Sequence, residues 1–281
     1  MSSTEIIRAR RRAFAQLHKS GCFAIPNPWD PGSAKYLQKL GFQALATTSS
    51  GAAWRHGKAD GQMNVEEVLV HLQEIVDATD LPVNADFEAG FADDAAGVAR
   101  NVRRAIATGV AGLSIEDSTG RPGAPLRDLP TSVERIRAAR AAIDESGGDT
   151  LLVGRAENFL VGHPDLDDVI QRLRAYAAAG ADCLYAPGIE TREQITAVVA
   201  AVAPTPVNLL VWKAGDLTMK DVAALGVRRV SVGGALARTA WGGFMRAAQA
   251  LASDGTFDGF RGAAAGADLN RLFQVKDAAT G

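Results

Sequence analysis

The stretch Pro82-Val83-Asn84-Ala85-Asp86-Phe87-Glu88-Ala89-Gly90 begins as a buried strand and ends in acidic residues. Alternate residues of an extended chain point to the same side, so Asn84, Asp86 and Glu88 share one face. Burying unpaired carboxylates against an apolar helix layer is costly, so these side chains should face water, a cation or the mouth of a barrel. A simpler interpretation is that they only cap the next helix, although the pair Asp93-Asp94 is better placed for that role.

Strand and helix signals alternate on both sides of this stretch. Short apolar runs precede amphipathic segments, and glycines such as Gly41, Gly109 and Gly180 end helices just before the next run. Eight such units with no linker between them predict an α/β fold, a single (β/α)₈ TIM-type barrel domain over residues 1–281 with an N-terminal helix and a C-terminal helical tail. A doubly wound sheet is the alternative. The expected strands are 23–27, 42–46, 81–86, 110–115, 151–155, 182–186, 207–211 and 227–232.

Composition narrows the class of protein. Apolar residues make up 47% of the chain and charged residues 22%, with a formal charge of −2. This balance gives no reason to expect nucleic acid or an anionic membrane as a partner. The run Arg10-Arg11-Arg12 is expected on a solvated helix face, and Cys22 and Cys183 are expected to be buried free thiols. Without a membrane-spanning run or a signal-peptide core, a cytoplasmic location is expected.

In a barrel the chemistry lies at the carboxyl ends of the strands. Acidic residues dominate the third and fourth ends, and Arg155 stands opposite them at the fifth. Oxygen ligands without a His or Cys cluster suit Mg²⁺ or Mn²⁺, and an arginine suits a substrate carboxylate or phosphonate. In strand order, the ends carry Asn27 and Asp30; Thr48 to Gly51; Asn84, Asp86 and Glu88; Glu116 and Asp117; Arg155 and Glu157; Tyr185; Asn208; and Ser231 to Gly234.

Short motifs follow one another in a fixed order between Asn27 and Gly234. They are Asn27-Pro-Trp-Asp30, Ser33-Ala34, Gly41-Phe42, Thr48-Ser49-Ser50, Gly57-Lys-Ala-Asp60, Asn84-Ala-Asp86 with Gly90, Gly109-Val-Ala-Gly112, Ile115-Glu-Asp117 and Arg155-Ala-Glu157. Through this set the chain resembles the isocitrate lyase and phosphoenolpyruvate mutase superfamily. The resemblance implies a barrel whose eighth helix is exchanged between subunits of a homo-oligomer, a dimer or tetramer. It also implies cleavage or rearrangement of C–C or P–C bonds beside an α-oxo acid, with Mg²⁺ stabilising an enolate.

The resemblance also assigns roles to single residues. Asp60, Asp86 and Glu116 would hold Mg²⁺ directly or through water, and Thr48 to Ser50 would bind the substrate carboxylate while Arg155 clamps its other anionic end. The predicted catalytic residues are Asp60, Arg155 and His56; the predicted substrate-binding residues are Trp29, Thr48, Ser49, Ser50, Gly51, Asn84, Arg155 and Asn208; and the predicted metal ligands are Asp86, Glu88, Glu116 and Asp60.

Two departures from the superfamily pattern bear on the reaction. Asn84 stands where the first Asp of an Asp-Ala-Asp motif is expected, so the metal should be held less tightly unless Glu88 compensates. The loop 118–127 contains neither the Cys nor the His of isocitrate and methylisocitrate lyases, so a thiol acid cannot act from it. The loop is also short and stiffened by Pro122 and Pro125, which disfavours phosphoryl transfer.

What remains is a Mg²⁺-dependent lyase that acts through an enolate on a small α-oxo (di)carboxylic acid. Decarboxylation or C–C cleavage of the oxaloacetate type is favoured. The alternatives are a methylisocitrate lyase-like reaction, phosphonopyruvate-type P–C chemistry, and a non-catalytic protein that binds α-oxo acids. Several further residues are ambiguous. His56 and His163 are either acid–base groups or solvated side chains, Tyr185 either an oxyanion donor or a packed core residue, Asp30 either a loop contact or a helix cap, and Gly233-Gly234 either a phosphate site or a tight turn.

Overall fold

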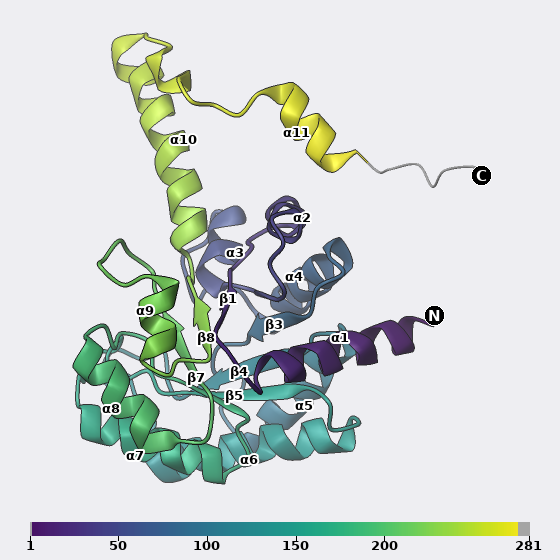
Figure 1. Cartoon of the computed structure of the whole chain (residues 1–281), viewed down its shortest axis with the longest axis vertical. Coiled ribbons are helices and arrows are strands. Elements are labelled where there is room, and N and C mark those ends of the chain that lie inside the picture. Colours follow the sequence, from purple (N-terminus) through teal and green to yellow (C-terminus); the bar gives the residue numbers. More distant parts are fainter. Residues whose placement is uncertain (1, 275–281) are drawn as a thin grey trace.

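The computed structural model describes residues 2–274 and shows eight parallel strands wound into a barrel (Figure 1). Neighbouring strands follow the order β1-β8-β7-β6-β5-β4-β3-β2. At the seam between β1 and β2, the amide of Ala46 donates to the carbonyl of Pro26 at 3.1 Å. The strands are β1 (Phe23–Ile25), β2 (Leu45–Ala46), β3 (Val83–Asp86), β4 (Gly112–Glu116), β5 (Leu151–Arg155), β6 (Cys183–Tyr185), β7 (Val207–Leu210) and β8 (Arg229–Ser231). The α/β barrel predicted from the sequence is confirmed.

Helices surround the barrel and place their apolar faces on the outside of the strands, where Val, Ile, Leu and Ala side chains form one continuous core. The helices of the described residues are α1 (Ser3–Leu17), α2 (Pro31–Lys39), α3 (Ser49–Arg55), α4 (Val65–Ala78), α5 (Ala95–Ala107), α6 (Leu129–Glu145), α7 (Leu166–Ala178), α8 (Arg192–Val202), α9 (Met219–Ala224), α10 (Ala235–Asp254) and α11 (Gly266–Phe273), with a short 3₁₀ turn η1 (Asp258–Phe260). Of these, α1, α10 and α11 lie outside the surrounding layer.

Helix α1 closes the amino-terminal end of the barrel. Phe14 is fully buried there against Phe23 and Ile25 of β1. The expectation of a solvated basic run is wrong for Arg11, which is only 6% exposed. Its guanidinium forms an ion pair with Asp149 at 2.8 Å and donates to the carbonyls of Ile106 and Val110. Arg11 therefore anchors α1 to the loops beneath the strands.

The segment after β2 forms a short helix where the hydrophobic periodicity of the sequence predicts none. Thr48 caps a short helix there, α3, and its Oγ1 accepts a hydrogen bond from the amide of Gly51 at 3.3 Å. A Cβ on Gly51 would lie 2.7 Å from Thr48 Cγ2 and 2.9 Å from Trp29 Cβ, so only glycine fits under this turn. The helix brings Ser49 and Ser50 to the mouth of the barrel.

Helix α10 projects away from the barrel instead of packing against it (Figure 1). Its apolar side chains are uncovered, and Phe244 and Met245 are each 62% exposed. Beside its first turn lies an apolar groove of about 690 Å³ between α2, α9 and β8, lined by Trp29, Tyr36, Leu37, Leu40, Met219, Val222 and Leu236 among others. Taken over residues 2–274, none of the helices combines the length and apolar character needed to cross a membrane.

Candidate active site

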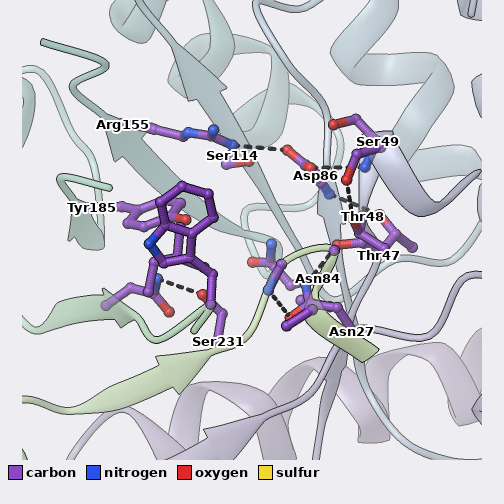
Figure 2. A pocket seen from close by; sticks show the side chains of 18 of the residues that line it. Asn27, Thr47, Thr48, Ser49, Asn84, Asp86, Ser114, Arg155, Tyr185 and Ser231 are labelled. Carbon is purple, nitrogen blue, oxygen red and sulfur yellow. Dashed lines mark hydrogen bonds and ion pairs between the residues drawn. The ribbon is translucent and has the colours of Figure 1, made fainter. Parts of the chain in front are cut away.

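A polar cavity of about 390 Å³ opens at the carboxyl ends of the strands (Figure 2). Barrel interiors are usually filled by branched apolar side chains, whereas polar residues from all eight strands or the segments that follow them line this one. The polar lining consists of Asn27, Thr47, Thr48, Ser49, Ser50, Asp60, Asn84, Asp86, Ser114, Arg155, Tyr185, Asn208, Arg229, Ser231 and Arg238. This composition suits a small, charged ligand more than an apolar one.

Asp86 stands at the end of β3 and is held from two sides. Its Oδ2 accepts a hydrogen bond from the amide of Ser49 at 2.9 Å, and its own amide donates to Thr47 Oγ1 at 2.9 Å. Across the cavity, Arg155 Nη1 lies 3.1 Å from Asp86 Oδ1 (Figure 2). The first turn of α3 therefore positions this carboxylate. The amide of Ser49, which could have bound a substrate carboxylate, already donates to Asp86.

Arg155, at the end of β5, is the positive centre of the site. The same Nη1 lies 3.4 Å from Glu116 Oε2, Nε donates to Glu157, and the guanidinium carbon lies 5.0 Å above the ring of Tyr185. Burial alone would lower the pKa of Arg155, but the carboxylates of Glu157 and Glu116 raise it well above its ordinary value. Arg155 thus stays charged and joins the ends of β3, β4 and β5.

The carboxylates of this region disfavour one another's ionisation. Burial, followed by the charges of Asp86 and Asp60, raises the pKa of Glu88 to about 8. Burial also raises the pKa of Glu116, and the pKa of Asp60 is raised by desolvation and then by Asp86. Glu88 further adopts φ +45°, a conformation that is strained for a residue with a side chain and that recurs at functional sites. The single positive charge of Arg155 therefore does not balance the four neighbouring acids Asp60, Asp86, Glu88 and Glu116.

These residues suit a hard divalent cation by their chemistry, since every donor is an oxygen. Within residues 2–274, however, no three His, Cys, Asp or Glu side chains converge as a ready coordination sphere. Two of these carboxylates, Asp86 and Glu116, are instead paired with Arg155 Nη1 at 3.1 Å and 3.4 Å. Asn84 Oδ1 already accepts a hydrogen bond from Arg229 Nη1 at 3.2 Å.

Asp117, the neighbour of Glu116, lies behind the cavity and does not line it. Its carboxylate is almost completely buried behind the cavity, where Oδ2 accepts from Tyr176 at 2.5 Å and from Arg172 at 3.2 Å. Its Oδ1 accepts from the amide of Glu157 at 2.8 Å. Asp117 therefore ties the end of β4 to the end of β5 and to α7.

The structure brings most of the predicted residues together. Asp60, Arg155, Thr48, Ser49, Ser50, Asn84, Asn208 and Asp86 line the cavity. Five do not. Glu88 and Glu116 lie beside it within reach of Asp86, and Gly51 is buried in the first turn of α3. His56 is exposed at the carboxyl end of α3, so the length of this helix separates it from the mouth of the barrel. Trp29 lines the apolar groove instead of the cavity.

The ambiguous residues are also placed. Asp30 caps α2, since its Oδ1 accepts from the amide of Ser33 at 2.6 Å. Gly233 has φ +52° and its amide donates to Asn27 Oδ1, as expected for a tight turn. His163 is exposed. Tyr185 lines the cavity, and burial raises the pKa of its phenol to about 12.

Sequence reasoning missed Arg229, which lines the cavity from below. It is the first residue of β8, whereas only the carboxyl ends of strands were considered as site positions. A signal was present in Arg228-Arg229, a charged pair that enters an otherwise apolar strand.

Comparisons with known proteins agree with this arrangement. The family model described as phosphoenolpyruvate phosphomutase matches residues 14–252. A protein of Burkholderia cenocepacia J2315, provisionally described as a lyase/mutase, is 47% identical, with a TM-score of 0.93 over 97% of this chain and 98% of that one.

Two curated relatives have named activities. The oxaloacetate decarboxylase of Paraburkholderia xenovorans (strain LB400) is 30% identical over 79% of this chain and 74% of its own. The 2-methylisocitrate lyase of Escherichia coli (strain K12) is 33% identical over 62% of this chain and 60% of its own. The chain is an enzyme of the phosphoenolpyruvate phosphomutase family and belongs to the isocitrate lyase and phosphoenolpyruvate mutase superfamily of lyases and mutases.

Proposed function

We propose that this enzyme is a Mg²⁺-dependent carbon–carbon lyase that decarboxylates a small α-oxo dicarboxylate of the oxaloacetate type. The observation that carries the proposal is the group of crowded carboxylates around Arg155, which meets a small polar cavity at Asp86 and Asp60. The oxaloacetate decarboxylases among its relatives support the substrate class.

Asp60, Asp86, Glu88 and Glu116 would hold Mg²⁺ or Mn²⁺. Bound there, the cation would stabilise the negative charge that develops on the oxo oxygen. Asn84, whose oxygen is directed to Arg229, is not needed in this set. Glu88 would supply the charge that is lost at position 84, because a bound cation would favour its ionised form.

The protein's own residues orient the substrate and stabilise charge. Arg155 stays protonated and presents Nη1 to the cavity beside Asp86, where it attracts the carboxylate next to the oxo group. The hydroxyls of Thr48 and Ser50, which are 3.1 Å apart at the mouth, are available to the same end of the substrate. Tyr185 keeps its proton and can donate to an anionic oxygen.

The loop between β4 and α6 favours decarboxylation over cleavage reactions that need an acid. Loss of CO₂ breaks the bond to the β-carboxylate and leaves its electron pair as an enolate, which water can protonate later. The loop is closed by a bridge between Ser118 and Leu126, and no residue from Ser118 to Arg127 is a Cys or His. Neither the loop nor the exposed His56 supplies the acid that isocitrate-type cleavage requires.

The enzyme is also proposed to work as a homo-oligomer, a dimer or tetramer, in the cytoplasm. The uncovered face of α10 and the apolar groove between α2 and α9 are complementary in character, and the helix of one subunit would fill the groove of another. Burial of these side chains would supply the hydrophobic stabilisation that α10 lacks in the single chain.

A substrate panel tests the proposed reaction. Loss of oxaloacetate, methylisocitrate and phosphonopyruvate is followed with Mg²⁺ and with EDTA. The proposal expects consumption of oxaloacetate alone, abolished by EDTA. Turnover of methylisocitrate without oxaloacetate would contradict it, and binding of α-oxo acids without turnover of any substrate would favour a binding protein.

A further inference from the structure

Arg229 lies at the floor of the cavity and is buried, with only 2% of its surface exposed. Its Nε donates to Asn208 Oδ1 at 2.8 Å, and its Nη1 donates to Asn84 Oδ1 at 3.2 Å. Nη1 also lies 3.5 Å from His18 Nε2. Three side chains from β7, β3 and the end of α1 therefore hold one guanidinium in the centre of the barrel.

All three of these partners are neutral. Asn208 and Asn84 are amides. Burial, and then the charge of Arg229, lowers the pKa of His18 to about 3, so this imidazole carries no charge at neutral pH. His18 Nδ1 lies 2.8 Å from the carbonyl oxygen of Phe14, so Nδ1 carries the ring proton and donates to this oxygen. Nε2 is then left as an acceptor.

No carboxylate compensates the charge of Arg229 in the described residues 2–274. The ionisable groups that act most on its pKa are Cys183 and Tyr185, and the pKa of each is itself raised by burial. Burial lowers the pKa of Arg229. An unpaired buried charge is strongly destabilising, so a protein that retains one gains from it elsewhere.

The guanidinium also has a free edge. Nη2 has no hydrogen-bond acceptor among residues 2–274, while Nε and Nη1 are both used. Around it the cavity floor offers further donors, among them Ser231, whose Oγ already accepts from Asn208 Nδ2 at 3.0 Å. The floor of the cavity is thus built to receive an anion.

Resting on the proposed function, we infer that Arg229 binds the substrate carboxylate remote from the metal-binding end, so that the enzyme selects α-oxo dicarboxylates over monocarboxylates. The sequence had assigned this end to Arg155. In the structure Arg155 is paired with Asp86, Glu116 and Glu157, whereas Arg229 has no anion at all. The two arginines therefore serve opposite ends of one ligand.

Calorimetric titration of the full chain tests this assignment. The probes are 3,3-difluorooxaloacetate, an isostere of oxaloacetate, and pyruvate, which lacks the second carboxylate; each is titrated with Mg²⁺ and again with EDTA. Arg229→Gln should weaken the dicarboxylate at least about tenfold, the scale of one charge-assisted hydrogen bond, and pyruvate less than about threefold. Arg229→Lys should recover part of the dicarboxylate affinity.

Arg228→Gln is the matched control, because this neighbouring arginine donates to the carbonyl of Gly21 outside the cavity. It should leave both affinities unchanged. Any of four results would overturn the inference. They are equal losses for both probes in Arg229→Gln, no loss for either probe, a selective loss in Arg155→Lys instead, and no dicarboxylate binding to the wild type.

A second measurement does not depend on the folding of a variant. A crystal structure of the wild type soaked with the same analogue should show a carboxylate within hydrogen-bond distance of Arg229 Nη2; an analogue bound elsewhere in the cavity would refute the assignment. If the dicarboxylate binds through Arg229 but oxaloacetate is not consumed, the inference stands and the proposed decarboxylation fails.

Discussion

The guanidinium of Arg155 reaches from the end of β5 to the end of β3, where its Nη1 lies 3.1 Å from Asp86 Oδ1. This pair joins the positive and negative sides of the cavity (Figure 2). A cation at Asp86 would compete with Arg155 for the oxygens of this carboxylate. Asp86 is consequently the residue on which metal binding should depend most.

Asp86→Ala should remove nearly all Mg²⁺ or Mn²⁺ binding, because it deletes the carboxylate whose charge acts on Asp60, Glu88 and Glu116 alike. Calorimetry should show at least about a tenfold loss of affinity, the usual lower scale for one charged ligand. Asp93→Ala is the control, since Asp93 is exposed and pairs only with Arg121. Unchanged affinity in the Asp86 variant would refute the metal assignment.

Asp117→Asn should destabilise the fold without touching the ligand. The buried carboxylate accepts from Tyr176, Arg172 and the amide of Glu157, and an amide can satisfy only part of this set. Removing one partner of a buried charge pair costs about 3 kcal/mol. Urea unfolding should therefore show a lower midpoint, whereas an unchanged midpoint would show that Asp117 does not tie β4 to β5.

His71→Leu should flatten the dependence of stability on pH. Burial lowers the pKa of His71 to about 4, and neither ring nitrogen has a hydrogen-bond partner in the described structure. Below pH 6.5 the unfolded state takes up a proton that the folded state refuses until about pH 4, so stability falls as the pH falls through this window.

The loss from His71 should reach up to about 3 kcal/mol at the acid end, since one pKa unit corresponds to about 1.4 kcal/mol. The leucine variant should lose this part of the slope, measured by unfolding at pH 7 and pH 5. His163→Leu, a change at an exposed histidine, is the control. Equal slopes in the wild type and His71→Leu would mean that His71 is not held neutral.

Phe244→Arg should weaken subunit association. Phe244 is 62% exposed on α10 and forms an edge-to-face pair with Trp241, at the centre of the uncovered apolar face. A charge there cannot enter the apolar groove without a partner. Sedimentation equilibrium should show smaller species than for the wild type, while Gln249→Glu on the same helix should not change the mass. A monomeric wild type would contradict the proposed exchange of α10.

Hydrophobic periodicity was enough to predict the barrel, because each strand–helix unit carries its own signal. The strand ends then predicted Asp86, Arg155 and Asn208 as neighbours, since parallel strands bring their carboxyl ends to one edge. Residues between elements were harder. The α3 helix was missed because Ser49-Ser50-Gly51 is typical of a loop, and only the capping residue Thr48 marked its start.

A long side chain can reach the cavity from a residue that does not stand at the end of a strand. Arg229 begins the strand that Ser231 ends, and its side chain lies among Asn84 and Asn208 inside the barrel. Sequence position therefore did not reveal it. Arg11 was misjudged for a related reason: a basic run shows charge but not which member turns toward buried carbonyl groups.

The release of CO₂ from oxaloacetate shows directly whether the protein is a decarboxylase. The rate is measured for the wild type, for Asp86→Asn and for buffer, all at the same free Mg²⁺, because the free cation promotes this decarboxylation by itself. The wild-type rate should be at least about a hundredfold above the metal-only rate, well below typical enzymatic accelerations, and the excess should be lost in Asp86→Asn and in EDTA. Equal rates for wild type, variant and buffer would contradict the proposed decarboxylation.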